Sequence, residues 1–310
     1  MIKYFKSTNG VLFEKEEYEE GCWVTAVAPG SAEIAMLIDQ FSIPEQFVRS
    51  SLDEEERSRI DVEDDCTLII VDTPVCTSSD SGNEYSTLPF GIIVTQKGIV
   101  TVSLRETALC NSFISGNIKG VSTKKYRRFV LKLLYQNATL FLTYLRQAEK
   151  EGAFAEKALK KSTGNNELLR ILHIEKGLVY FSTGLKGDEA VLEKLLRMKF
   201  ICDYPEDAEL LEDVIVENRQ AIEMCAIYRD ILSRTMEAYS GVISNNLNSV
   251  MKLLAAITII LTVPQIVFAL WGINTPIPFE YSPLGFWLVI GVAAVATAIA
   301  TAFAFFKKWL

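Results

Sequence analysis

The sequence has one histidine and six scattered cysteines, and no two cysteines form a Cys-x-x-Cys pair. Structural zinc sites and disulfide frameworks need such residues at close, regular spacing. A glycine-rich phosphate loop and a nucleophile with a histidine partner are missing too. We therefore predict a protein that is not an enzyme, needs no organic cofactor, and keeps its cysteines reduced as packing residues.

Basic residues are outnumbered along most of the chain. The net charge is −8, from 31 Lys and Arg against 39 Asp and Glu. One acid and two bases follow Lys252 and contribute +1, so the residues up to Lys252 carry about −9. Such a surface repels a polyanion, which argues against nucleic acid as a partner. It attracts cations, although many cytosolic domains are equally acidic.

Charge is almost absent from the last sixty residues. Leu253–Trp271 is a run of 19 residues without a charged side chain, and Leu284–Phe306 is a second run of 23. A helix needs about 20 apolar residues to cross the hydrocarbon core of a membrane. The pattern predicts a C-terminal hairpin of two transmembrane helices in a lipid bilayer, joined by a short loop over residues 272–283.

The few basic residues near the spans predict the orientation of this hairpin. Lys252 precedes the first span, Lys307 and Lys308 follow the second, and the loop has no lysine or arginine. The positive-inside rule places these three lysines in the cytoplasm. We expect a multi-pass protein of the cell membrane with cytoplasmic N- and C-termini, a periplasmic loop, a second span at 284–306 and a basic cytosolic tail at 307–310.

The residues before the spans predict two further parts. Residues 1–122 have the short β-rich runs and turn signals of an α/β domain. Residues 123–204 carry apolar positions at helical spacing. The expected elements are strands at 23–27, 67–71, 90–95 and 99–104, helices at 31–38, 124–161, 167–185 and 189–200, a solvated helix and turn at 52–65, and a loop at 72–87.

One helix is expected to run from Glu206 into the first span. The residues that could interrupt it before Trp271 are Gly241 and Pro264, and proline is tolerated inside membrane helices. At 1.5 Å per residue, such a helix would be roughly 100 Å long. It needs neighbours along its whole length. We therefore expect residues 205–271 to form a stalk and the first span, with the membrane beginning at about residue 253.

The first span carries a stripe of polar and small residues. They recur at steps of three and four, which places them on one face of a helix. The stripe comprises Ser244, Asn248, Met251, Ala255, Thr258, Thr262, Gln265, Ala269 and Gly272. A glutamine in hydrocarbon is costly unless it faces protein or water. The stripe therefore either packs against another helix or forms the wall of a pore.

A short motif follows the first span. Gly272-Ile273-Asn274, with two prolines soon after it, resembles the Gly-Met-Asn signature of the CorA family of divalent cation channels. The likeness continues in the family's order along the chain, through the acidic stretch 52–65, the segments 179–183 and 248–252, and the terminal Lys-Lys-Trp-Leu. Isoleucine stands where the family usually has methionine, and such variants occur among relatives that include ZntB-like zinc transporters.

The resemblance implies a funnel-shaped homopentamer in which five first spans line a pore. Asn274 would form a ring of amides at the periplasmic mouth, beside Gly272 and Ile273. Amide carbonyls can bind the hydration shell of Mg²⁺, which gives up its waters reluctantly. The implied pore-lining residues are Asn248, Met251, Ala255, Thr258, Thr262, Gln265 and Ala269, and the implied basic collar is Lys252, Lys307 and Lys308.

The roles of Asn274 and of the three lysines each have an alternative that the residues alone support about equally. Asn274 could be the residue that ends the first helix in a left-handed conformation. The three lysines could serve only as topology anchors, and both roles are compatible.

The resemblance also implies a regulatory site for cytosolic Mg²⁺ between neighbouring subunits. Alignment through the Gly-x-Asn motif places Asp213 at the stalk ligand. Its partner is expected in the 72–87 loop, among Asp72, Asp80 and Glu84. The alternative for each acid is a solvated surface position. Mg²⁺ would thus be both the transported and the regulatory ion.

Three functions are compatible with the sequence. The first is a passive channel for Mg²⁺ uptake, with Co²⁺ or Ni²⁺ as further ions, driven by about 4.6 kcal/mol per divalent ion at 100 mV. The second is a ZntB-like Zn²⁺ transporter, although the spans and loop lack the Cys and His ligands that zinc prefers. The third is a membrane-anchored interaction or sensor protein without ion flux, against which the stripe through Gln265 argues. The expected partners are copies of the same chain, the lipid bilayer and divalent cations.

Overall fold

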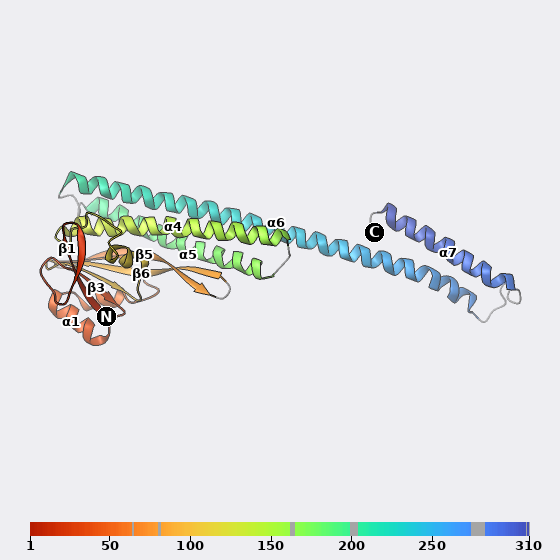
Figure 1. Cartoon of the computed structure of the whole chain (residues 1–310), viewed down its shortest axis with the longest axis horizontal. Helices are drawn as coiled ribbons and strands as arrows, with labels where there is room; N and C mark the ends of the chain where they lie inside the picture. Colours follow the sequence, from red (N-terminus) through yellow and green to blue (C-terminus); the bar gives the residue numbers. More distant parts are fainter. Residues whose placement is uncertain are drawn as a thin grey trace. The chain divides into compact units, whose positions relative to one another are not determined.

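A computed structural model describes residues 1–63, 65–79, 82–161, 165–198, 204–273, 283–307 and 309. The chain divides into two compact units, Met1–Arg234 and Thr235–Leu310. The first unit contains a β-sheet with helices on both faces, and the second contains the apolar C-terminal helices (Figure 1).

The first unit is built on a seven-stranded sheet with the strand order β2-β1-β3-β7-β6-β5-β4. Neighbouring strands are antiparallel except β3 and β7, which are parallel. The strands are β1 (Ile2–Thr8), β2 (Val11–Lys15), β3 (Trp23–Val27), β4 (Arg59–Glu63), β5 (Cys66–Ser79), β6 (Gly82–Val94) and β7 (Ile99–Ser103). The strands predicted at 90–95 and 99–104 are found as the end of β6 and as β7, which form an antiparallel pair.

The central strands are buried on both faces of the sheet. Leu68 and Ile70 of β5 pack in one core with α1 (Ser31–Phe41) and α2 (Glu45–Ser50). Ile69 and Val71 pack in a second core with α3 (Ala108–Ile114) and α4 (Tyr126–Lys161). Alternate strand residues point to opposite faces, so the unbroken apolar run in β5 is what a sheet covered on both sides requires.

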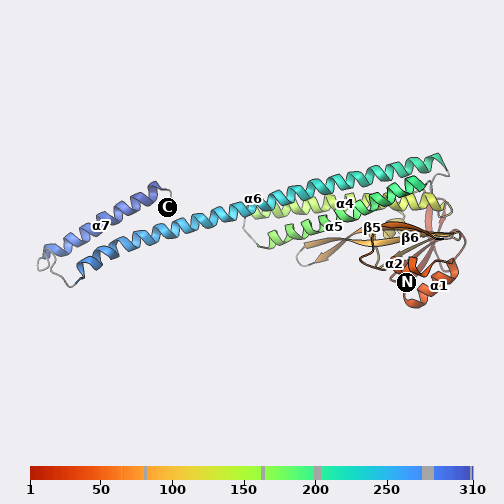
Figure 2. The same cartoon turned by 180° about the vertical axis from the view of Figure 1, so that it is seen from behind.

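Three long helices lie side by side over the face of the sheet that carries Ile69 and Val71. Figures 1 and 2 show α4, α5 (Asn165–Met198) and the first part of α6 (Pro205–Trp271) running alongside one another. Trp23 of β3 is fully buried beneath them, with its ring 5.2 Å from that of Phe129 on α4. The predicted helix at 124–161 is therefore confirmed and forms part of the core of this unit.

The helices predicted at 167–185 and 189–200 are wrong as separate elements, because α5 is continuous through residues 185–189. Glycine in this segment does not break the helix. A Cβ atom added to Gly177, Gly184 or Gly187 would lie 2.5, 2.8 or 2.9 Å from Tyr85, Asp72 or Ser58, respectively. The glycines allow α5 to approach the sheet closely.

The loop predicted at 72–87 is also wrong, because most of this segment pairs as a long ribbon of β5 and β6 from Thr67↔Val94 to Ser79↔Gly82. The ribbon lies against α4 and α5. Asn83 donates a hydrogen bond to Glu151 of α4, and the Tyr85 ring is 5.9 Å from that of Phe181 on α5. The polar residues of this segment therefore belong to a paired ribbon that packs against α4 and α5.

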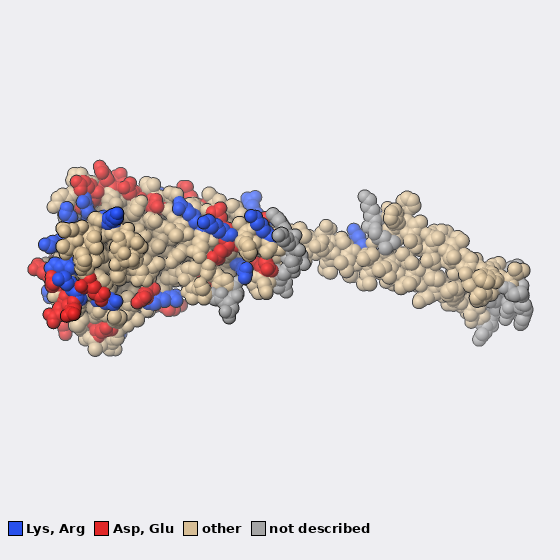
Figure 3. All heavy atoms as spheres, in the orientation of Figure 1, with Lys and Arg blue, Asp and Glu red and all other residues tan. Residues whose placement is uncertain are grey.

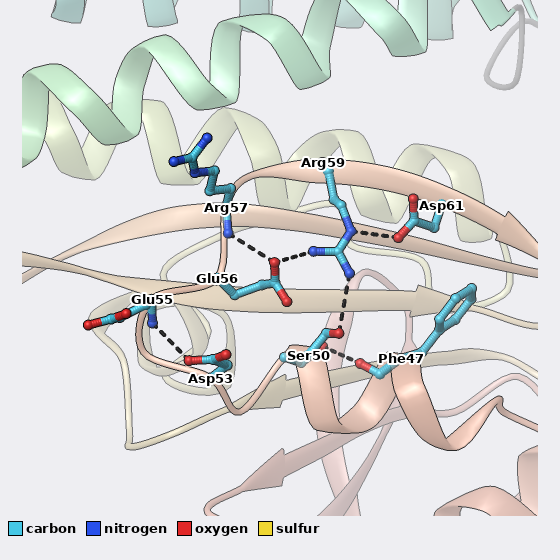
Figure 4. A network of polar contacts seen from close by, with 9 residues as sticks. Phe47, Ser50, Asp53, Glu55, Glu56, Arg57, Arg59 and Asp61 are labelled. Carbon is cyan, nitrogen blue, oxygen red and sulfur yellow. Dashed lines mark hydrogen bonds and ion pairs between the residues drawn. The ribbon is translucent and has the colours of Figure 1, made fainter.

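Within the acidic stretch 52–65, where a solvated helix and turn were expected, turns precede the strand β4 at Arg59–Glu63, and no helix forms among its described residues. Its charges pair with one another (Figure 4). Arg59 donates from Nε to Asp61 at 2.6 Å, pairs with Glu56, and donates from Nη2 to Ser50 at 3.2 Å. Local ion pairs thus partly neutralise the stretch, and β4 adds an edge strand to the sheet.

The prediction of two long apolar C-terminal helices is confirmed. Helix α6 runs unbroken over 67 residues through Pro264, and α7 spans Pro283–Phe306. Among the described residues, α6 and Leu284–Phe306 of α7 are long and apolar enough to cross a membrane.

Candidate ion pathway and cytosolic acids

Within the second unit, α6 has a covered face and an open face. Its buried and half-buried residues in the apolar segment are Ala256, Ile260, Val263, Pro264, Val267 and Trp271. Pro264 and Phe268 line one side of an apolar groove of about 810 Å³, and residues of α7 between Ile290 and Phe306 line the other. The covered face is therefore the one that α7 packs against.

The predicted stripe lies on the open face. Its members are exposed at every position that was predicted to line a pore, namely Asn248, Met251, Ala255, Thr258, Thr262, Gln265 and Ala269. At 100° per residue, the centre of the stripe lies roughly 180° around α6 from the face that α7 covers. The structure thus separates an apolar side of α6, packed on α7, from a polar side that α7 does not touch.

Two hydroxyl groups of the stripe are oriented by the helix itself. Thr258 donates to the carbonyl oxygen of Leu254 at 2.8 Å, and Thr262 donates to that of Thr258 at 2.7 Å. Each hydroxyl hydrogen is therefore used inside the helix, while the oxygen keeps lone pairs that accept hydrogen bonds. Because the waters around a cation point their hydrogens outward, such oxygens suit contact with a hydrated cation.

The described part of the Gly-Ile-Asn motif ends the helix. The Gly272 N–H donates to the carbonyl oxygens of Phe268 and Ala269 at 3.0 and 3.2 Å, and Ile273 is exposed. A Cβ atom on Gly272 would meet the Phe268 oxygen at 3.4 Å, an ordinary contact. The helix end alone therefore does not require glycine. Asn274 lies outside the described residues.

The described lysines of the collar are both exposed. Lys252 lies on α6, and Lys307 follows α7, where its N–H donates to the Phe303 oxygen at 3.0 Å. Figure 3 shows the charged side chains crowded on the first unit, whereas the second unit shows one basic spot in this view. Lys308 lies outside the described residues.

The predicted regulatory acids are divided between surface and interior. Asp213 on α6 and Glu84 on β6 are exposed, whereas Asp72 on β5 is half-buried. Asp80 lies outside the described residues. Within the part of the chain that the structure describes, no group of three or more His, Cys, Asp and Glu side chains could hold a metal ion. The described residues of one chain therefore do not form such a cluster, and a site shared between subunits stays a prediction.

Asp72 meets a buried acid that sequence reasoning missed. Asp188 of α5 is 3% exposed and accepts hydrogen bonds from the Asp72 N–H at 2.8 Å and the Ser58 hydroxyl at 3.0 Å. Burial and the nearby Asp72 carboxylate raise the pKa of Asp188 well above its usual value, and burial raises the pKa of Asp72. The available sequence signal was the spacing of Gly177, Gly184 and Gly187, which marks the face of α5 that contacts the sheet.

A second missed contact fixes the start of the stalk helix. Arg128 of α4 donates to Asp207 at 2.6 Å and to Glu206 at 2.5 Å. These acids occupy the first turn of α6, where a negative charge also interacts favourably with the helix dipole. Asp207 is 3% exposed, so this ion pair connects α4 to the first turn of α6 inside the first unit.

The comparisons with known proteins agree with this architecture. A family model described as CorA-like Mg²⁺ transporter protein matches residues 18–308. The cobalt/magnesium transport protein CorA of Methanocaldococcus jannaschii is 27% identical over 291 residues, which cover 89% of this chain and 87% of that protein.

Solved structures share the fold. The complete structure of the CorA magnesium transporter from Methanocaldococcus jannaschii matches with a TM-score of 0.83 at 23% identity, covering 98% of this chain and 96% of that one. The full-length CmaX protein matches with a TM-score of 0.72 at 17% identity, covering 98% and 97%. Because the family model spans nearly the whole chain, the protein belongs to the family of CorA-like Mg²⁺ transporter proteins.

Proposed function

We propose that this chain forms a homopentameric channel for divalent cations, with Mg²⁺ as its main ion and Co²⁺ or Ni²⁺ as further ions. Membership of the family makes it a transporter and not an enzyme. The observation that carries the proposal is the exposed polar stripe on the face of α6 opposite α7. The relative named as a cobalt/magnesium transport protein supports this choice of ions.

Five copies of the stripe around one axis would enclose a water-filled path. The threonine oxygens and the Gln265 amide would accept hydrogen bonds from the shell of a hydrated ion, and none of the seven pore-lining residues carries a charge. Neutral ligands bind weakly enough to release the ion. The Asn274 ring would receive the ion at the mouth, because amide carbonyls can bind the shell of Mg²⁺ without removing it.

The cytosolic side would close the pathway in response to Mg²⁺. Asp213 is exposed on α6, as a ligand shared between subunits must be. Among its expected partners, Asp72 is already engaged with Asp188 and Ser58. Among the described residues, the exposed Glu84 is therefore the better candidate for the partner of Asp213. Asp80 precedes it in the same segment of the sequence. Bound Mg²⁺ would offset the repulsion between these acids and favour a closed state.

The orientation follows the lysines. Lys252, Lys307 and Lys308 would lie on the cytosolic side, with both termini in the cytoplasm and the 272–283 loop outside. The zinc-transporter alternative lacks Cys or His ligands in the spans and loop, so Zn²⁺ would have to pass hydrated.

The mouth residue supplies the test of this proposal. Asn274→Ala should abolish or strongly reduce Mg²⁺ uptake into proteoliposomes while leaving the assembly intact. The matched control is Asn245→Ala, which removes an exposed amide of α6 that is not part of the stripe and should transport like the wild type. Wild-type uptake by Asn274→Ala would show that Asn274 only ends the helix.

A further inference from the structure

A cavity of about 370 Å³ lies between β6, α4 and α5 of the first unit. Its volume falls in the range of about 300–1,000 Å³ that is typical of sites for small molecules. The side chains that decide what it can bind are Asn83 of β6, Lys150, Glu151 and Phe154 of α4, and Arg170 and His173 of α5. The described lining contains no residue of the α6 stripe and none of the proposed regulatory acids, so the proposed ion pathway leaves this cavity without a role.

Helical spacing brings cationic and apolar side chains to this cavity together. Lys150 and Phe154 are four residues apart on α4. Arg170, His173 and Ile174 are spaced at i, i+3 and i+4 on α5, and all five residues line the cavity. Residues three and four apart are neighbours on one face of a helix. Each helix therefore presents a positive charge and an apolar surface to the same space.

The acidic side chain of the described lining is Glu151, and its carboxylate is already bound. The side-chain amides of Asn83 and Gln147 both donate to Glu151 Oε1, Gln147 at 3.4 Å. These contacts hold the carboxylate against the wall of the cavity. Its single negative charge is smaller than the two positive charges of Lys150 and Arg170, so the described lining is cationic.

Two polar groups of the lining are left for a ligand. The Lys150 ammonium and the imidazole of His173, the single histidine of the chain, make no hydrogen bond or ion pair with the residues that the structure describes. His173 is half-buried, and buried polar groups are usually hydrogen-bonded to protein or to water. In the same lining, Phe154 is 66% exposed, more than any other described aromatic residue of the first unit. Hydrogen-bond donors thus adjoin an uncovered aromatic ring.

We propose that this cavity binds a small phosphate monoester with an apolar or aromatic body. A phosphate monoester carries about −1.5 to −2 charges at neutral pH, which matches the two cations Lys150 and Arg170. The planar guanidinium can donate two parallel hydrogen bonds to phosphate oxygens, and the lysine and histidine N–H groups add further donors. Phe154 and Ile174 then cover the body of the ligand. A divalent cation fits this lining poorly, because the two positive side chains repel it.

The test is a calorimetric titration of the purified full chain in detergent, with EDTA present and phenyl phosphate as the probe. The wild type should bind one phenyl phosphate per chain. Lys150→Gln should bind it about tenfold or more weakly, because a charged hydrogen bond to the phosphate is lost. The matched control is Lys186→Gln, which neutralises an exposed lysine of α5 outside the lining and should bind like the wild type. Phe154→Ala should weaken the binding of phenyl phosphate severalfold and leave that of inorganic phosphate unchanged.

Absence of saturable binding by the wild type, or equal affinities of the wild type and Lys150→Gln, would overturn the proposal. Wild-type affinity of Phe154→Ala for phenyl phosphate would overturn the assignment of the apolar body. If Lys150→Gln fails to fold, His173→Ala decides the question in the same assay and should bind phenyl phosphate severalfold more weakly than the wild type. Binding that appears only when Mg²⁺ is added would also overturn the proposal, because a metal ion would then hold the phosphate.

Discussion

Glycines at the contact between α5 and the sheet determine how closely that helix can pack. We predict that Gly184→Ala destabilises the first unit by about 1–3 kcal/mol, because the added methyl group must displace Asp72. The control is Gly241→Ala on α6, where a Cβ atom meets nothing within 4 Å and alanine should stabilise the helix by up to about 1 kcal/mol. Thermal unfolding of the full chain measures both. Equal midpoints for the two variants would mean that α5 does not depend on this close approach.

Single residues differ in how far the sequence reveals them. The positions of the stripe could be predicted because helical periodicity is local, and each predicted member proves to be exposed. The role of Asp188 could not, because its partner Asp72 is 116 residues away in the sequence. Asp72 was one of three candidates for a regulatory ligand, and no sequence signal indicated that its carboxyl group would lie against α5.

At the scale of single elements, the open face of α6 is the feature that we propose carries ion passage. We predict that Gln265→Leu lowers Mg²⁺ flux severalfold or more without changing assembly, because it replaces a polar group of the stripe with an apolar one. Phe268→Leu, which alters a residue lining the groove with α7, is the control and should conduct like the wild type. Flux assays on purified variants decide this. Normal conduction by Gln265→Leu would assign the stripe to helix packing.

The stalk part of α6 supplies the prediction on gating. Asp213→Lys places a fixed positive charge where we propose that Mg²⁺ binds. The protection of this variant from proteolysis should therefore depend less on Mg²⁺ than that of the wild type. The exchange of exposed Glu223 on the same helix for lysine tests charge alone and should leave the dependence unchanged. If Asp213→Lys shows the same Mg²⁺ dependence as the wild type, the chain is gated elsewhere or not by cytosolic Mg²⁺.

Two errors among the predicted elements, the loop at 72–87 and the break at 185–189, have one physical cause. The segments 72–87 and 185–189 contain the polar residues and glycines that usually mark loops and breaks. In the folded chain these residues make tertiary contacts instead. The ribbon of β5 and β6 packs on α4 and α5, and the glycines of α5 allow that helix to approach the sheet closely. Elements with strong local patterns, such as α4 and the two apolar helices, are close to their predicted bounds.

At the scale of the whole molecule, the order of parts along the chain was readable from composition and spacing, but the number of copies was not. One chain leaves the stripe of α6 exposed, and the family resemblance implies that five copies enclose it. We predict a detergent-stable homopentamer by native mass spectrometry. A monomer or dimer as the largest species would contradict the pore.

Uptake into proteoliposomes tests the central claim most directly. With the purified wild type reconstituted and an inside-negative potential applied, Mg²⁺ should enter without any second substrate, at a rate that rises with the potential, and Zn²⁺ should enter more slowly. Liposomes without protein and liposomes with Asn274→Ala should show little or no entry. Absence of Mg²⁺ entry, or entry of Zn²⁺ alone, would contradict the account of this protein as a magnesium channel.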